Sequence, residues 1–507
     1  VSPNITLGIR VYLINYLIST NPFYTGVAKH HVTMRDIAGM LDRVIGQYGT
    51  NSRVGGKTAG MMLANCILNP GLPNPDRQAP MWQGELGRVQ SWYLTSQVFN
   101  AFMRHNRLEY AHGLKYMDHD SIADAQDELT ERFLSGSMPQ DVRLQLRELV
   151  RDTAGTPLIV RSSSLLEDSL GFPFHGKYES YFVANQGSEE ENLQELCTAI
   201  SRVYVGIFST NALDYRRDKD LLDYKEMMSV LVQTVVGKAY GHYYFPAFAG
   251  VAFSRNEYRW SPRIEPEAGM LRLVMGLGTR AVDRSGDDYP RIVALSHPQL
   301  RPESGRGEQM RYSQRWVDVI NLDTGELETL HFVDLIRELR QAGLTHGPAA
   351  PDLSEALSVG NETELRPMRR GESLDMALGL SPGEIPGYGS MAISFETLIS
   401  NTGFAELMRA VLSELEHAYG RPVDVEFAVQ DGVLYILQCR PQSASTAPGS
   451  GMIGTGSTGS AGISAVPIPQ RPDPDAVLFN GTRGAFGNAH IPDIRWIIRV
   501  RDAVYRG

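Results

Sequence analysis

Cysteine and long apolar runs are scarce in this sequence, and each absence excludes a class of protein. The chain has only three cysteines, Cys66, Cys197 and Cys439, and no CxxC pair, so we expect neither a disulfide framework nor a structural zinc site. No apolar run approaches the roughly 20 residues of a membrane-spanning helix, and no signal-peptide pattern is present. We therefore expect a cytoplasmic protein that does not interact with a membrane.

An excess of basic residues is also missing. Lys and Arg number 48 against 58 Asp and Glu, which gives a formal net charge of −10. Because proteins that bind nucleic acid along their whole chain are normally basic, we expect no nucleic-acid partner. The composition is otherwise ordinary, with 42% hydrophobic and 21% charged residues, and the 507 residues predict about three to four domains or subdomains.

Common catalytic signatures are absent as well. The 12 histidines show no HExxH or other paired ligand spacing, which argues against a metal centre built on paired histidines. No G-x-S-x-G motif occurs, so a nucleophilic serine on a strand-to-helix elbow is not expected.

Several segments are compatible with phosphate binding without being specific for it. Gly55-Gly56-Lys57 precedes a helix-like stretch and could offer backbone N–H groups and an ammonium to a phosphate, although the full P-loop spacing is absent. Arg161 ends an apolar strand just before three serines, which suits an anion or a structural ion pair equally. The loops 175–177 and 276–280 could also approach a phosphate, but each could equally be a simple connection between two elements.

Segments of helical and strand-like periodicity alternate along the chain, which predicts an α/β (α+β) fold. Residues 1–50 look helical. Further helices are predicted at 59–68, 142–150, 193–207 and 404–419. Strands are predicted at 157–161, 228–236, 249–253 and 271–275, with a hairpin at 316–330.

Residues 443–474 have the composition of a flexible linker. Six of the fourteen residues from Gly449 to Gly462 are glycine, and prolines follow at 467, 469, 472 and 474. Residues 475–507 resemble the start of another domain. The chain also begins at Val1 and not at methionine, so we expect a fragment of a longer protein.

Residues 423–440 alternate with period two on both sides of a central turn, which predicts a β-hairpin. A two-residue Asp-Gly turn would place Val425 opposite Gln438. A three-residue loop with Gly432 in the left-handed conformation places Val425 opposite Leu437 and makes one face wholly apolar. Because the register of a strand follows its hydrophobic pattern, we predict the three-residue loop.

The other face of this hairpin then carries four polar residues: Asp424, Glu426, Gln438 and Arg440. Carboxylate and amide oxygens are suitable ligands for Mg²⁺, and arginine binds phosphate oxygens in pairs. The alternative is an ordinary hairpin with one solvated face, which is the commoner case because half-solvated antiparallel strands are frequent. The hairpin by itself leaves both interpretations open.

Eight short segments occur in an order that resembles a known family. They are Val54–Lys57, Val160–Ser164 with Glu167-Asp168, Phe174–Ser180, Tyr215-Arg216, Val232-Gln233, Gly250–Asn256, Gly276–Gly278, and Asp424–Glu426 with Leu437–Pro441. Over about residues 51–442 the sequence resembles the N-terminal nucleotide-binding domain of the pyruvate phosphate dikinase and phosphoenolpyruvate synthase family.

The resemblance implies a two-lobed ATP-grasp domain that holds ATP and Mg²⁺ between its lobes. In that family ATP phosphorylates a histidine on a separate swivelling domain. The phosphohistidine then travels to a barrel domain, where pyruvate becomes phosphoenolpyruvate.

The resemblance also implies roles for individual residues. Lys57 and Arg161 match phosphate-binding residues of the first lobe, and Arg440 matches the contact to the γ-phosphate, so these three are the catalytic candidates. Glu426 and Gln438 match the ligands of the Mg²⁺-nucleotide. Two further residues match the nucleotide site: Asp424, and Gln233, which follows a predicted strand at 229–232 near the expected adenine hinge.

The sequence departs from the family at several points. The phosphohistidine segment and the pyruvate-binding barrel are missing, and Thr279 stands where many members have Glu. We therefore expect a partner domain beyond residue 507 or in trans, with pyruvate and phosphoenolpyruvate reached only through missing domains. The alternatives are a dikinase with another final acceptor, such as a glucan or an antibiotic hydroxyl, and a module that senses ATP without turnover.

Overall fold

The computed structural model describes most of the chain up to residue 442. The described residues are 3–46, 52–68, 85–164, 177–224, 226–282, 288–344, 351–361, 363–381, 384 and 386–442. Residues 1–442 and 443–507 separate into two units, and every described residue belongs to the first. The predicted linker at 443–474 and the segment 475–507 lie outside the described residues, as do Glu167, Asp168 and most of the loop at 175–177.

The described part of the region 1–50 is mostly helical, as predicted, but Val44–Ile45 form a short strand. Its helices are α1 (Pro3–Leu17), α2 (Pro22–His31) and α3 (Met34–Leu41). Asn21 caps the first turn of α2, and Thr33 and Asp36 form a capping box at the start of α3. Ile14 and Ile37 are buried in the same core as the second sheet described below.

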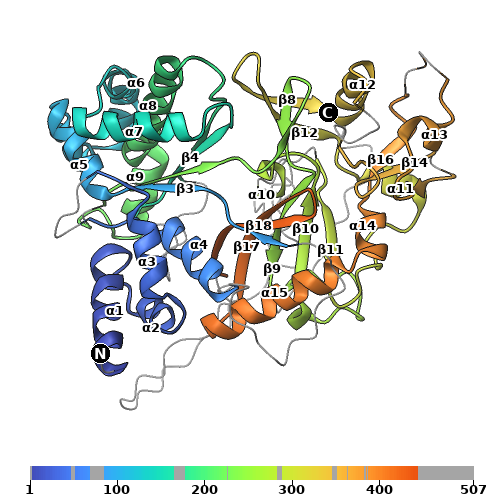
Figure 1. The fold of residues 1–507 in the computed structure, drawn as a ribbon, viewed down its shortest axis with the longest axis horizontal. Coiled ribbons are helices and arrows are strands. Elements are labelled where there is room, and N and C mark those ends of the chain that lie inside the picture. Colours follow the sequence, from blue (N-terminus) through green and yellow to red (C-terminus); the bar gives the residue numbers. More distant parts are fainter. Residues whose placement is uncertain are drawn as a thin grey trace, which may run out of the picture. The chain divides into compact units, whose positions relative to one another are not determined.

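A five-stranded sheet follows, with helices on one face. Its strands, in spatial order, are β1 (Val44–Ile45), β3 (Ser91–Leu94), β6 (Val230–Thr234), β4 (Leu158–Ser162) and β5 (Ser180–Val183). The covering elements are α5 (Ser96–His105), η1 (Glu109–Tyr116), α6 (His119–Leu134), α7 (Gln140–Asp152), α8 (Glu189–Val205), η2 (Gly206–Phe208) and α9 (Thr210–Asp218) (Figure 1). Val160 and Val232 point into this covered face, so the residues that alternate with them, Arg161 and Gln233, point to the other face.

A six-stranded sheet forms the second half of the unit. Its strands, in spatial order, are β11 (Arg291–Ala294), β10 (Met270–Val274), β9 (Phe248–Phe253), β17 (Val423–Gln430), β18 (Val433–Pro441) and β2 (Leu86–Gly87). Two helices cover its apolar face: α15 (Phe404–Tyr419), which crosses β17 and β9, and α4 (Gly56–Ile67), which packs on β18 (Figure 1).

Two smaller sheets and several short helices complete the described part. The sheets are β13 (Leu327–His331), β12 (Trp316–Asn321), β8 (Tyr243–Phe245) and β7 (Lys238–Tyr240), and β15 (Arg366–Pro367), β14 (Leu357–Val359) and β16 (Met391–Ile393). The helices are η3 (Pro266–Ala268), α10 (Thr279–Val282), α11 (Arg306–Arg311), α12 (Phe332–Gln341), α13 (Leu374–Leu378) and α14 (Glu396–Asn401). Within the described ranges, no helix has the length and apolarity that a membrane crossing requires.

The predicted α/β class is confirmed, since helices pack on mixed sheets. The helix predicted at 404–419 is α15, and the hairpin predicted at 316–330 is formed by β12 and β13. The strand predicted at 228–236 is shorter, because β6 begins at Val230 and ends at Thr234.

The prediction of a three-residue loop in the 423–440 hairpin is wrong. Gln430 pairs with Val433, and the two residues between them, Asp431 and Gly432, both have positive φ, at 50° and 74°. This is a two-residue turn of the kind whose twist matches that of the flanking strands.

A β-bulge corrects the register that this short turn would otherwise impose. Phe427 pairs with Ile436, but Glu426 pairs with Gln438, so Leu437 is the extra residue. The apolar face is therefore built differently from the prediction. Its β18 members are Leu434, Ile436 and Cys439, and not Val433, Tyr435 and Leu437.

The predicted polar face survives the change of register. Asp424 lies opposite Arg440, and Glu426 lies opposite Gln438. Directly opposed residues of an antiparallel pair share a face, so the prediction that these four residues lie together is confirmed.

Glycine at position 60 allows α4 to approach β18. A Cβ atom at Gly60 would lie 2.1 Å from the carbonyl oxygen of Cys439, whereas a Cβ atom at Gly39, in the exposed helix α3, would meet nothing within 4 Å. We expect Gly60→Ala to lower the free energy of unfolding by about 1–3 kcal/mol through overpacking. Gly39→Ala should raise it by about 0.5–1 kcal/mol, because alanine is the better helix former.

Urea denaturation of both variants, followed by circular dichroism, measures this difference. A Gly60→Ala variant as stable as Gly39→Ala would show that α4 can move away from β18 at little cost.

Candidate functional site

Arg161 connects the two large sheets. It lies in β4 of the five-stranded sheet, and its Nη2 donates to Glu426 Oε2 at 2.6 Å and to Gln438 Oε1 at 2.8 Å on the six-stranded sheet. The side chains of Arg161 and Glu426 are only 10% and 18% exposed. Arg161 therefore forms a largely buried ion pair with Glu426 and a hydrogen bond with Gln438, two predicted site residues that are far from it in the sequence.

The bulge in β18 contributes a third acceptor to Arg161. The extra residue of a bulge is left out of the ladder of backbone hydrogen bonds. That residue is Leu437, and its carbonyl oxygen accepts a hydrogen bond from Arg161 Nη1 at 3.3 Å. The irregularity that corrects the register thus also orients the guanidinium.

A second ion pair lies beside the first on the same hairpin face. Arg440 Nε donates to Asp424 Oδ1 at 2.7 Å and to Oδ2 at 3.0 Å. Burial raises the pKa of Asp424 to about 6, and Glu426 adds to the rise, although Arg440 opposes it. Burial also acts to raise the pKa of Glu426, but Arg161, Arg440 and Lys57 together outweigh burial and hold that pKa below its usual value. Glu426 is therefore the carboxylate that stays ionised.

Lys57 joins this group from the first turn of α4. It is buried, and its Nζ donates to Ser162 Oγ at 3.0 Å, directly beside Arg161 in β4. It also lies close enough to Glu426 to lower the pKa of that carboxyl. The sequence-predicted cations Lys57, Arg161 and Arg440 are thus brought together around one carboxylate.

The serines after Arg161 hold the start of α4. Gly56 N–H donates to the Ser164 carbonyl at 3.0 Å, and Thr58 N–H donates to Ser163 Oγ at 3.1 Å. Gly55 has φ of 83°, and a Cβ atom there would lie 1.5 Å from the Ser163 carbonyl oxygen. Of the N–H groups in Gly55-Gly56-Lys57 that could have faced a phosphate, that of Gly56 is already used, because the Ser164 carbonyl accepts from it.

Gln233 lies inside β6 and not after a strand, which corrects the sequence-based placement. It pairs with Ser91 on one side and Ile159 on the other. Its Nε2 donates to Ser91 Oγ at 3.1 Å and to Met61 Sδ at 3.0 Å. Gln233 shares a sheet face with Arg161, since it lies opposite Ile159, two residues along β4 from Arg161.

Arg272 and Phe253 lie on the site face of the six-stranded sheet and were missed by the sequence reasoning. Val251 pairs with both Glu426 and Arg272, so the three residues form one row across the strands. Phe253 pairs with Asp424, and the Arg272 guanidinium carbon lies 5.3 Å from the centre of its ring. The signal was available, because Arg272 is the one charged residue in the strand sequence MLRLV.

The loop at 276–280 is anchored by carboxylates. Thr279 Oγ1 donates to Asp318 Oδ2 at 2.6 Å, and Arg280 Nε donates to Asp318 Oδ1 at 2.9 Å. Arg280 also pairs with Asp288 at 3.2 Å. In the structure these side chains fix the loop to β12, which supports the interpretation of a tight connection.

Two hairpin residues present oxygen atoms of the kind that binds magnesium. Glu426 and Gln438 offer a carboxylate and an amide oxygen side by side, and Mg²⁺ is commonly held by one or two carboxylates together with substrate phosphates. Among the residues that the structure describes, no group of three or more His, Cys, Asp or Glu is arranged to hold a metal ion.

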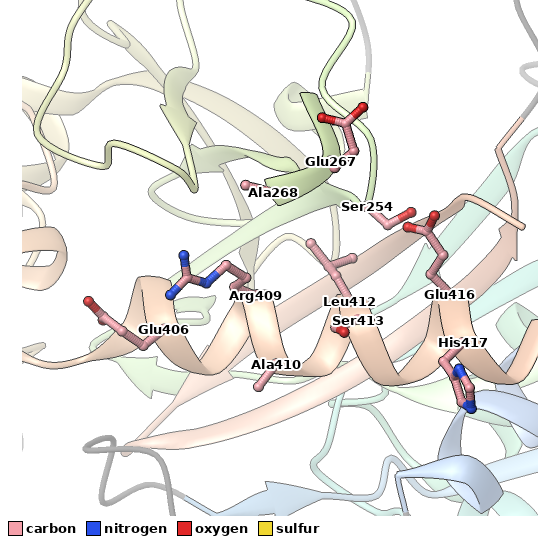
Figure 2. Close-up of a pocket in the computed structure, with 10 residues that line it drawn as sticks. All are labelled: Ser254, Glu267, Ala268, Glu406, Arg409, Ala410, Leu412, Ser413, Glu416 and His417. Carbon is pink, nitrogen blue, oxygen red and sulfur yellow. The ribbon is translucent and has the colours of Figure 1, made fainter. Parts of the chain in front are cut away.

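A groove of about 640 Å³ runs along α15 beside η3, and it contains none of the predicted site residues. Figure 2 shows its lining, in which Arg409 and Glu406 lie toward one end and Glu416, Ser254 and Glu267 toward the other. The groove is therefore separate from the cluster around Glu426.

A double-mutant cycle of Arg161→Met and Glu426→Gln tests the buried pair. Removing either partner leaves the other side chain poorly compensated, so the two effects on the free energy of unfolding should be non-additive by about 1–3 kcal/mol. Chemical denaturation of the single and double variants measures the coupling. The exposed pair Arg132 and Glu128 is the control, and its coupling should be much smaller. Equal couplings for the two pairs would contradict the burial of Arg161 against Glu426.

Comparison with known proteins finds sequences similar to this chain. Two relatives are each 20% identical to the chain. The first, a probable phosphoenolpyruvate synthase of Methanocaldococcus jannaschii, aligns over 372 residues, which are 71% of this chain and 24% of that protein. The second, the uncharacterized phosphotransferase YvkC of Bacillus subtilis, aligns over 334 residues, 64% of this chain and 29% of that protein. The chain thus spans only about a quarter of the length of these relatives.

The family match is broader than either of these alignments. Residues 51–451 match the family described as pyruvate phosphate dikinase, AMP/ATP-binding domain. That range covers most of the chain and includes all seven predicted site residues. The chain therefore belongs to the family of AMP/ATP-binding domains of pyruvate phosphate dikinase.

Proposed function

We propose that this chain is the ATP-binding module of a phosphotransferase, with MgATP bound between the five-stranded and the six-stranded sheet as in an ATP-grasp domain. The observation that carries the proposal is the buried contact of Arg161 with Glu426, with Arg440 paired to Asp424 on the same hairpin face and Lys57 hydrogen-bonded to Ser162 beside Arg161. Three cations and two carboxylates gathered in this way suit a triphosphate and its metal. Membership in an AMP/ATP-binding family supports the same assignment.

Each sheet would contribute part of the chemistry. Lys57 and Arg161, from the side of the five-stranded sheet, would bind phosphate oxygens. Arg440, from the hairpin, would contact the γ-phosphate. Transfer of a phosphoryl group mainly requires that the phosphates are positioned and that their charge is neutralised. Hydrogen bonds to Ser162, Asp424 and Glu426 hold the three cationic side chains in place.

Glu426 and Gln438 would hold the magnesium ion, which when bound supplies additional positive charge to the phosphates. The two side chains lie opposite each other on neighbouring strands, so their oxygens are presented from a rigid element. Asp424 would orient Arg440 through its paired hydrogen bonds. Gln233 would line the nucleotide site from β6.

The acceptor that we propose is a histidine on a separate swivelling domain, either in the same protein or in trans. The relative named phosphoenolpyruvate synthase supports pyruvate as the final acceptor, reached through domains outside the described residues. The relative named only as a phosphotransferase leaves a different final acceptor, such as a glucan or small-molecule hydroxyl, as the second candidate. A cytoplasmic location remains a prediction from the sequence.

Calorimetric titration of MgATP into the chain tests nucleotide binding. We expect binding in the micromolar range, weakened at least about tenfold in Arg440→Met and in Glu426→Gln, because each loses a charged hydrogen bond or a metal ligand. Arg132→Met, on an exposed helix face, should bind like the wild type. A folded chain that does not bind MgATP would overturn the proposal.

Phosphoryl transfer is tested by mixing the chain with labelled ATP and with the separate domain of a family member that carries the acceptor histidine in its unphosphorylated form. Label on the histidine of that domain, lost in Arg440→Met, would support catalysis. MgATP binding without any transfer would favour the ATP-sensing alternative.

A further inference from the structure

The oxygen atoms proposed as magnesium ligands already have a partner. Arg161 Nη2 donates to both Glu426 Oε2 and Gln438 Oε1, at 2.6 and 2.8 Å. A magnesium ion would use lone pairs of the same side chains, at about 2.0–2.1 Å. Arg161 cannot leave by losing its proton, because a guanidinium stays charged in proteins. A metal ion that binds either side chain would also lie beside the positively charged guanidinium, so the two cations compete for these side chains.

The charges around Glu426 also disfavour a free metal ion. Among the described residues, Lys57, Arg161 and Arg440 face two carboxylates, Asp424 and Glu426, so these five side chains together carry a net positive charge before a dication arrives. A triphosphate reverses this balance, since its oxygens can accept hydrogen bonds from all three cations. Two protein oxygens are also too few for six-coordinate magnesium, which commonly completes its shell with phosphate oxygens and water.

We propose that Arg161 excludes free divalent metal from Glu426 and Gln438, and that metal enters only with nucleotide phosphates, to which the guanidinium transfers its hydrogen bonds. The inference rests on the proposed function and adds an order of binding to it.

Release of Arg161 would also loosen a contact between the sheets. Its donor atoms come from β4, and all three of its acceptors lie on β17 and β18. A nucleotide that draws the guanidinium away from these strands would therefore weaken this contact between the two sheets.

Titration of Mn²⁺ into the chain without nucleotide, followed by the electron paramagnetic resonance signal of free Mn²⁺, tests the exclusion. We expect Arg161→Met to bind Mn²⁺ at least about tenfold more tightly than the wild type. In that variant the metal no longer has to displace a charged hydrogen bond from Glu426 and Gln438. The gain should disappear in Arg161→Met combined with Glu426→Gln, which would place the metal on Glu426.

Arg161→Lys provides a second variant if Arg161→Met does not fold by circular dichroism. Lysine keeps the charge but presents a single ammonium in place of the fork, so its Mn²⁺ affinity should fall between those of the wild type and of Arg161→Met. Affinity for Mn²⁺ in Arg161→Lys no greater than in the wild type would count against competition for the two oxygens.

Two outcomes separate this inference from the proposed function. A wild-type chain that binds MgATP, and also binds free Mn²⁺ as tightly as Arg161→Met, would overturn the exclusion and leave the proposed function standing. A gain in Mn²⁺ affinity that persists without Glu426 would do the same. A folded wild-type chain that does not bind MgATP would overturn the proposed function, and with it the part of the inference in which the metal enters with nucleotide phosphates.

Discussion

The buried ion pair between Arg161 and Glu426 is the contact on which the candidate site depends. Removing two charges from water is costly, and their attraction offsets that cost only when the geometry is good and the remaining polar atoms are satisfied. The chain meets most of this requirement, although Arg161 Nε is buried without a hydrogen-bond partner among the described residues. Gln438 and the Leu437 carbonyl accept further hydrogen bonds from Arg161, and Lys57 and Arg440 add positive charge near Glu426.

The β-bulge in β18 reconciles two demands on the hairpin. The Asp431-Gly432 turn fixes a tight two-residue connection, which would put Val425 opposite Gln438 and mix polar and apolar residues on each face. One extra residue, Leu437, shifts the register between Phe427 and Glu426. The apolar residues near the turn and the polar residues far from it then each keep a single face.

Helix α4 shows how close packing positions a charged side chain. Gly60 permits the helix to lie against the Cys439 carbonyl, and Gly55 permits its first turn to lie against Ser163. The serines that follow Arg161 accept from the backbone of that turn and from Lys57. One short segment, 161–164, thus supplies the arginine of the site and orients its lysine.

The sequence by itself determined the α/β class, the family, and the set of four polar residues on one hairpin face, because periodicity and order of motifs are local or linear properties. It did not determine the hairpin register or the place of Gln233. The register depends on a β-bulge that the alternation of residues does not reveal, and the place of Gln233 depends on the pairing of β6 with β3 and β4, which are distant in sequence. Only the tertiary structure decided that Arg161 donates to Glu426 and Gln438, 265 and 277 residues away. Such a contact is set by how two sheets pack, and no local pattern encodes it.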